Sequence, residues 1–248
     1  MIGLKTLIPK EFRPFLKYIG PSAFDVIEWK KSLKPIGQIS SRYFTNDGVE
    51  NLIKTYQAYK PQDLKLVNEN LGDIKVQPNE LGEMILKIYF SQLENPNGSF
   101  LDLKKDNFFL KDNYISWQPN GLWHKWDNHF REGLLYVYKG FYDSQNALMQ
   151  QGLEKMSLVH SDMKESTKKE IIDLLVSHVG SESPTNVKFS LEIFEKSFED
   201  FFKILKSEKI RLPADFLFLG IYLVSLYSNL EKIDLPFNVQ KAYLEKNQ

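Results

Sequence analysis

The chain contains no cysteine among its 248 residues, which excludes disulfide bonds, thiolate metal sites and cysteine nucleophiles. It also lacks net charge, because 32 Lys and Arg residues balance 32 Asp and Glu residues. No basic stripe runs among its aromatic residues, so nucleic-acid binding is not expected. An intracellular, cytoplasmic protein is the expectation that fits these absences.

Long apolar runs are missing as well. The N-terminal residues MIGLKTLIPKEF include a Lys and a Pro and do not form the continuous apolar segment of a signal peptide. The most apolar stretch, residues 216–230, is shorter than the ~20 residues that cross a bilayer and includes polar residues. It predicts a buried helix. The first 60 residues carry 10 Lys and Arg against 5 Asp and Glu, which leaves peripheral membrane contact open, although a solvated face is the simpler explanation.

Helical periodicity covers most of the remaining sequence and predicts a mainly α fold. An N-terminal helical segment, residues 1–78, is expected to precede a helical domain, residues 79–248. A small hairpin is expected where two β-like runs flank Lys111–Asn113. The predicted elements of the domain are a helix from Asn79 to the breaker at Asn95–Gly98, strands Phe108–Leu110 and Tyr114–Trp117, helices Phe130–Tyr138 and Asp143–Met156 hinged at Gly140, and helices Met163–Val179, Val187–Leu205 and one starting at Pro213.

Aromatic residues recur with helical spacing in the stretch 187–205. This stripe predicts core packing rather than a ligand site. Its members are Phe189, Ile193, Phe194, Phe198, Phe201 and Phe202.

The segment Gly98–Asn107 contains the residues whose spacing most resembles that of a catalytic site. Asp102 is followed five residues later by Asn107, on a loop that leads into the predicted hairpin. This is the layout of a kinase catalytic loop, in which the Asp accepts a proton from the attacking group and the Asn binds Mg²⁺. Asp and Asn also cap ordinary turns, so the pattern alone favours a structural role.

Four segments in order resemble the UbiB (AarF-type) family of atypical kinases, which are associated with ubiquinone and other isoprenoid lipids. Residues 37–61, with Gly37, Gln38 and Arg42, resemble the family's signature segment. Residues 80–107 resemble its helix and catalytic loop, residues 130–159 its next helical pair, and residues 212–230 its closing helix. The resemblance implies the helical C-lobe of a kinase-like fold, with Asp102 as the catalytic residue, Asn107 as a metal and cofactor ligand and Gln38 as a cofactor-binding residue.

The same comparison shows departures that argue against catalysis. The signature Lys falls on Pro35, and the catalytic-loop His falls on Phe100. The metal-binding Asp-Phe-Gly falls on residues 119–121, so Pro119 stands where the carboxylate that binds Mg²⁺ belongs. Only about sixty residues separate Gln38 from Asp102, too few for the nucleotide-covering lobe.

These departures lead to the expectation of an inactive, pseudokinase-like scaffold or accessory protein in isoprenoid or quinone metabolism, without a cofactor. Its expected partner is a protein or an apolar, lipid-like ligand, and a homo-oligomer is left open. The first alternative is a weakly active kinase or ATPase that uses Mg-ATP with Asp102 and Asn107, where Asp106 or Asp112 replaces the lost metal ligand. The second is an unrelated helical module that binds proteins.

One histidine cluster remains. His124, Asp127 and His129 lie within six residues and could share a metal ion, but their spacing matches no standard zinc site. A surface loop with half-buried tryptophans is the favoured interpretation.

Overall fold

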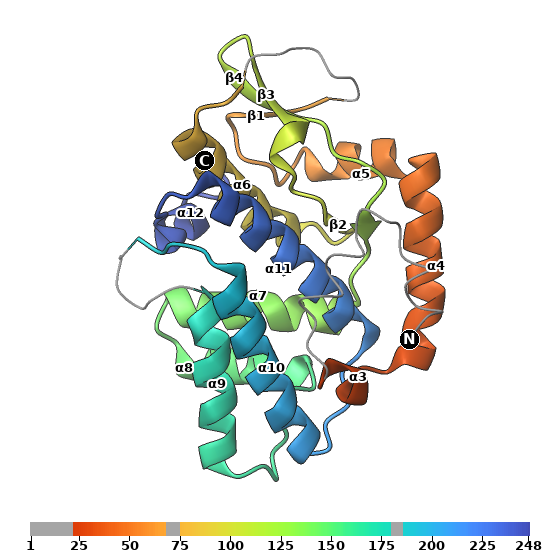
Figure 1. Ribbon diagram of the computed structural model, residues 1–248, viewed down its shortest axis with the longest axis vertical. Helices are drawn as coiled ribbons and strands as arrows, with labels where there is room; N and C mark the ends of the chain where they lie inside the picture. Colours follow the sequence, from red (N-terminus) through yellow and green to blue (C-terminus); the bar gives the residue numbers. More distant parts are fainter. Residues whose placement is uncertain (1–21, 68–74, 180–185) are drawn as a thin grey trace.

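The computed structural model describes residues 22–67, 75–179 and 186–248. The predicted mainly α class is confirmed: helices form most of the molecule, and the strands form two small sheets (Figure 1). The helices are α3 (Ala23–Val26), α4 (Trp29–Thr45), α5 (Val49–Tyr56), α6 (Pro78–Glu94), α7 (Asn128–Tyr142), α8 (Asn146–Lys155), α9 (Glu165–Val179), α10 (Leu191–Ser207), α11 (Ala214–Ile233) and α12 (Val239–Leu244).

The expected hairpin is present as β3 (Phe108–Lys111) and β4 (Tyr114–Trp117), which pair antiparallel. Its two turn residues, Asp112 and Asn113, have φ of 50° and 63°. Asp and Asn tolerate this left-handed conformation, which a two-residue turn needs to match the twist of the strands. A third strand, β1 (Leu64–Leu66), pairs parallel to β4 and was not expected from the sequence, because three residues are too few to show an alternating pattern.

Helix α11 crosses the middle of the molecule, between the sheet at one end and helices α7 to α10 at the other (Figure 1). Most of its side chains are buried, and it contacts α4, α6 and α10. By length and composition α11 resembles a membrane span, but 72% of its most apolar window is buried inside the protein. This burial fits the predicted core helix and explains why the residues are apolar on all sides.

Helices α7 and α8 pack closely against each other, but the chain does not turn at Gly140 as predicted. Gly140 lies inside α7, and the chain turns after Tyr142. A Cβ atom at Gly140 would collide with the backbone of Met149 in α8, so this glycine permits close helix packing and does not act as a hinge. Gly133 and Gly152 approach each other's carbonyl oxygens in the same interface.

Helix α10 buries the predicted aromatic stripe with one exception. Phe194, Phe198, Phe201 and Phe202 are buried, whereas Ile193 is 66% exposed. The helix begins at Leu191, later than predicted, because the Ser190 side chain accepts a hydrogen bond from the Ile193 amide and caps it. Phe189 lies in the extended segment before this cap, and its side chain is also buried.

Two helical glycines provide a matched test of the packing. A Cβ atom at Gly82 of α6 would overlap the buried Phe237 ring, whereas a Cβ at Gly37 of α4 would meet nothing within 4 Å. We expect Gly82→Ala to lower the free energy of unfolding by about 1–3 kcal/mol through overpacking. Gly37→Ala should raise it by about 0.5–1 kcal/mol through the lower entropy of the unfolded chain. Chemical denaturation of both variants checks this, and equal effects at the two sites would contradict the packing.

Candidate functional site

The loop that carries Asp102 is anchored on the core helix α11. It connects β2 (Ser99–Phe100) to a 3₁₀ turn (Lys105–Asn107) that leads into β3. The Ser225 hydroxyl accepts a hydrogen bond from the Leu103 amide at 2.9 Å, and the Asn229 side-chain oxygen Oδ1 accepts one from the Lys105 amide at 3.1 Å. Both side chains are buried, so they satisfy backbone donors that have left water.

Asp102 itself is enclosed by its own loop and by its neighbours. The residue is only 1% exposed. One carboxylate oxygen accepts a hydrogen bond from the Lys104 amide at 3.2 Å. The other accepts one from Asn120 Nδ2 at 2.6 Å and lies 3.7 Å from Lys104 Nζ. Burial raises the pKa of Asp102, and the hydrogen bonds and the lysine charge oppose this rise.

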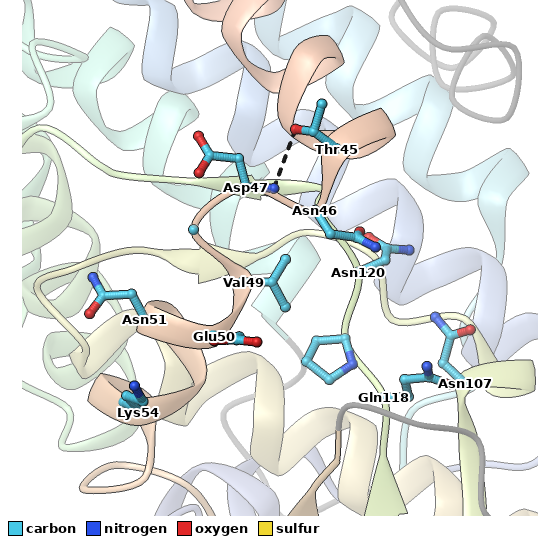
Figure 2. Close-up of a pocket in the computed structure, with 12 residues that line it drawn as sticks. Thr45, Asn46, Asp47, Val49, Glu50, Asn51, Lys54, Asn107, Gln118 and Asn120 are labelled. Atoms are coloured by element: carbon cyan, nitrogen blue, oxygen red, sulfur yellow. Dashed lines mark hydrogen bonds between the residues drawn. The ribbon is translucent and has the colours of Figure 1, made fainter.

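A polar pocket lies beside this loop, between the α4–α5 junction and the end of the hairpin (Figure 2). We call it the hairpin pocket; its volume is about 750 Å³. Asn107 and Asn120 line it, whereas Asp102, which is hydrogen-bonded to Asn120, does not. The lining residues are Thr45, Asn46, Asp47, Gly48, Val49, Glu50, Asn51, Lys54, Asn107, Gln118, Pro119 and Asn120.

Asn46 and Asn120 join the two sides of the hairpin pocket and were not identified from the sequence. Asn46 ends α4 in the left-handed conformation, and its side-chain oxygen accepts a hydrogen bond from the Gly121 amide at 3.1 Å. Asn120 donates to Asp102 and accepts from the Leu122 amide at 2.9 Å. Gly121 packs against the Arg42 carbonyl so closely that a side chain would collide there. An isolated Asn-Gly pair predicts only a turn, so these long-range contacts had no sequence signal.

Gln38 lies in a different pocket from Asn107. This second pocket, which we call the α4–β5 pocket, has a volume of about 440 Å³ and includes Arg42, His124 and Asp215. Strand β5 (Trp123–His124) forms part of its wall. The Trp123 ring contacts Arg42 of the α4–β5 pocket and Gly48 of the hairpin pocket, and its indole nitrogen donates to the Asp47 carbonyl. The structure thus places Asn107 and Asn120 in one pocket and joins Asn120 to Asp102 by a hydrogen bond, whereas Gln38 lies in another pocket.

The segment 123–129 is only partly the surface loop that we expected. Lys125, Asp127 and His129 are exposed and Trp123 is half-buried, but His124 and Trp126 belong to the core. Trp126 is 2% exposed and His124 is buried, stacked against Phe218 with a centroid distance of 4.1 Å. Asp127 caps α7 by accepting hydrogen bonds from the amides of His129 and Phe130. The aromatic residues are drawn inward because β5 pairs with β2 and passes over α11.

The described part of the chain contains no cluster of side chains that could bind a metal ion. Among residues 22–67, 75–179 and 186–248, no three His, Asp or Glu side chains lie close enough to share an ion. Asp106 lies exposed in the 3₁₀ turn, and Asp112 lies exposed in the hairpin turn. His124 instead pairs with Asp215, at 2.9 Å from Nε2 to the carboxylate.

Neither a protein-family model nor a curated protein matches this chain. The UbiB resemblance is accordingly carried by the sequence motifs alone.

The buried His124–Asp215 pair predicts a defined pH dependence of stability. Burial lowers the pKa of His124 from its ordinary value of 6.5, against the raising effect of Asp215. Burial alone would raise the pKa of Asp215, but the hydrogen bonds from His124 and the Asp127 amide leave it lowered. Below pH 6.5 the unfolded chain therefore binds a proton that the folded histidine resists, and stability falls.

We expect the free energy of unfolding to decrease between pH 6.5 and 5 in the wild type and to change less in His124→Gln. His129→Gln, at an exposed position in α7, is the matched control and should keep the wild-type slope. Urea denaturation at several pH values measures this. An identical slope in wild type and His124→Gln would exclude His124 as its source.

Proposed function

We propose that this protein is a non-catalytic, kinase-like scaffold. The observation that carries the proposal is the enclosure of Asp102, the candidate catalytic base. A general base must reach the proton that it removes, either directly or through one water molecule. Asp102 instead accepts hydrogen bonds from its own fold on both carboxylate oxygens, and Asn120 rather than Asp102 lines the hairpin pocket. This arrangement supports a bracing role in which Asp102 fixes the loop to the segment 119–121.

The charges of the hairpin pocket favour the same conclusion. Asp47 and Glu50 line it against a single lysine, Lys54. A triphosphate needs cationic groups or Mg²⁺ to neutralise it, and two carboxylates repel it. Pro119 also lines the pocket and has no side-chain metal ligand. The wall beside Asn107 therefore suits polar contacts better than nucleotide binding.

A protein partner fits better than an isoprenoid ligand. Small-molecule pockets usually have volumes of about 300–1,000 Å³. Two apolar cavities lined by described residues, between α10 and α11 and between α7, α8 and α11, have volumes of about 10 and 40 Å³. Phe44, at the end of α4 beside the hairpin pocket, is 73% exposed. The link to isoprenoid or quinone metabolism rests on the motif resemblance alone.

Exchanging the two partners of the Asp102–Asn120 hydrogen bond tests the bracing role. Asp102→Asn places two amides face to face, and Asn120→Asp places two carboxylates face to face. Each single variant should lose about 1–3 kcal/mol of unfolding free energy, because a buried polar group loses its partner. The double variant Asp102→Asn/Asn120→Asp restores a donor opposite an acceptor and should recover most of the loss.

Nucleotide chemistry is measured on the same set of proteins. We expect no Mg-ATP hydrolysis above that of Asp102→Asn, because Asp102 is not available as a general base. Wild-type hydrolysis that is lost in folded Asp102→Asn, and not regained in the double variant, would support the kinase or ATPase alternative and refute the scaffold.

A further inference from the structure

The α4–β5 pocket combines three elements that are distant in the sequence. Helix α4 contributes Gln38 and Arg42, the segment after β5 contributes Lys125, and the start of α11 contributes Asp215. His124, Asp127 and Ala214 also line it. Its volume of about 440 Å³ lies within the range of small-molecule sites.

Among the described residues, no carboxylate lies within salt-bridge distance of Arg42 or Lys125, the positive groups of this pocket. The central carbon of the Arg42 guanidinium lies over the Trp123 ring, 4.0 Å from the ring centroid. Asp47 is close enough to raise the pKa of Arg42, but burial has the larger effect and lowers it. A bound anion would stabilise this partly buried cation.

The negative groups, by contrast, already have donors. Asp215 accepts hydrogen bonds from His124 Nε2 at 2.9 Å and from the Asp127 amide at 3.0 Å. Asp127 accepts from the amides of His129 and Phe130 at the start of α7. The carboxylates are therefore engaged by the fold, whereas Arg42 and Lys125, which line the pocket, form no salt bridge with any residue that the structure describes.

We propose that the α4–β5 pocket binds the oxyanion group of a small ligand, a phosphate or a carboxylate, with Arg42 and Lys125 as its charged donors and Gln38 as a neutral donor. The cation–π contact with Trp123 restrains the Arg42 side chain, and a planar guanidinium can donate two parallel hydrogen bonds to an oxyanion. Lys125 adds a flexible point charge. The positive end of α11, where Ala214 lines the pocket, favours the same charge. This proposal does not depend on the scaffold role.

Titration of the full chain with inorganic phosphate, and separately with acetate, tests the site at an ionic strength kept constant with sodium chloride. The indole N–H signal of Trp123 in NMR spectra reports binding, because this ring contacts Arg42. We expect saturable shifts with at least one anion, and the tighter of the two identifies the headgroup. If neither anion gives a saturable shift in the wild type, the proposal is overturned.

Charge-removing variants locate the site. Arg42→Gln should weaken binding about tenfold or more, because a charge-assisted hydrogen bond contributes about 1.5–3 kcal/mol. Arg42→Lys should have an intermediate effect, since it keeps the charge but loses the planar fork. Lys125→Gln, at an exposed position where folding is not at risk, should weaken binding less than Arg42→Gln but measurably.

Lys54→Gln in the hairpin pocket is the matched control and should bind like the wild type. Circular dichroism confirms that each variant is folded. If Arg42→Gln fails to fold, Lys125→Gln decides the question alone. Unchanged affinity in Lys125→Gln, or an equal loss in Lys54→Gln, would refute the assignment to this pocket.

Discussion

The buried hydrogen bonds between α11 and the loop 101–107 fix the loop that carries Asp102 and Asn107, and the two pockets beside it depend on that position. An apolar helix that crosses a core cannot satisfy the amides of a loop packed against it, and each unpaired buried donor costs about 1–3 kcal/mol. Ser225 and Asn229, four residues apart on α11, supply the missing acceptors. With the loop anchored there, Asp102 is enclosed and Asn107 reaches the hairpin pocket.

The same anchoring decides which surfaces are available to ligands. Strand β5 pairs with β2, which precedes the loop, and its His124 pairs with Asp215 at the start of α11. Trp123 then contacts residues of both pockets, so the hairpin pocket and the α4–β5 pocket are neighbours with different chemistry. One is lined by amides and carboxylates, and the other exposes cationic donors. A scaffold with a separate anion site is consistent with this division.

Local patterns predicted the elements whose signals lie within a few residues. The period of three to four residues located α6, and the two strands around residues 111–113 located the hairpin. The errors came from residues whose role depends on a distant neighbour. Gly140 allows α7 to pack closely against α8 and is not a hinge. Ile193 lies on the exposed side of α10, although its spacing matched that of the buried aromatic residues. Strand β1 has only three residues, and it is a strand through its hydrogen bonds to β4, which is distant in the sequence.

The sequence by itself determined the mainly α class, the hairpin, the apolar helix α11 and the position of Asp102 and Asn107 on one loop. Each of these follows from side-chain chemistry and short-range periodicity, which act over a few residues. Only the tertiary structure decided that Asn120 is hydrogen-bonded to Asp102, that Gln38 lies in another pocket, and that Arg42 lies over the Trp123 ring without a counter-ion within 4 Å among the described residues. These outcomes join residues that are 18 to 81 positions apart, because packing α4 and β5 against α11 sets contacts that spacing along the chain does not encode.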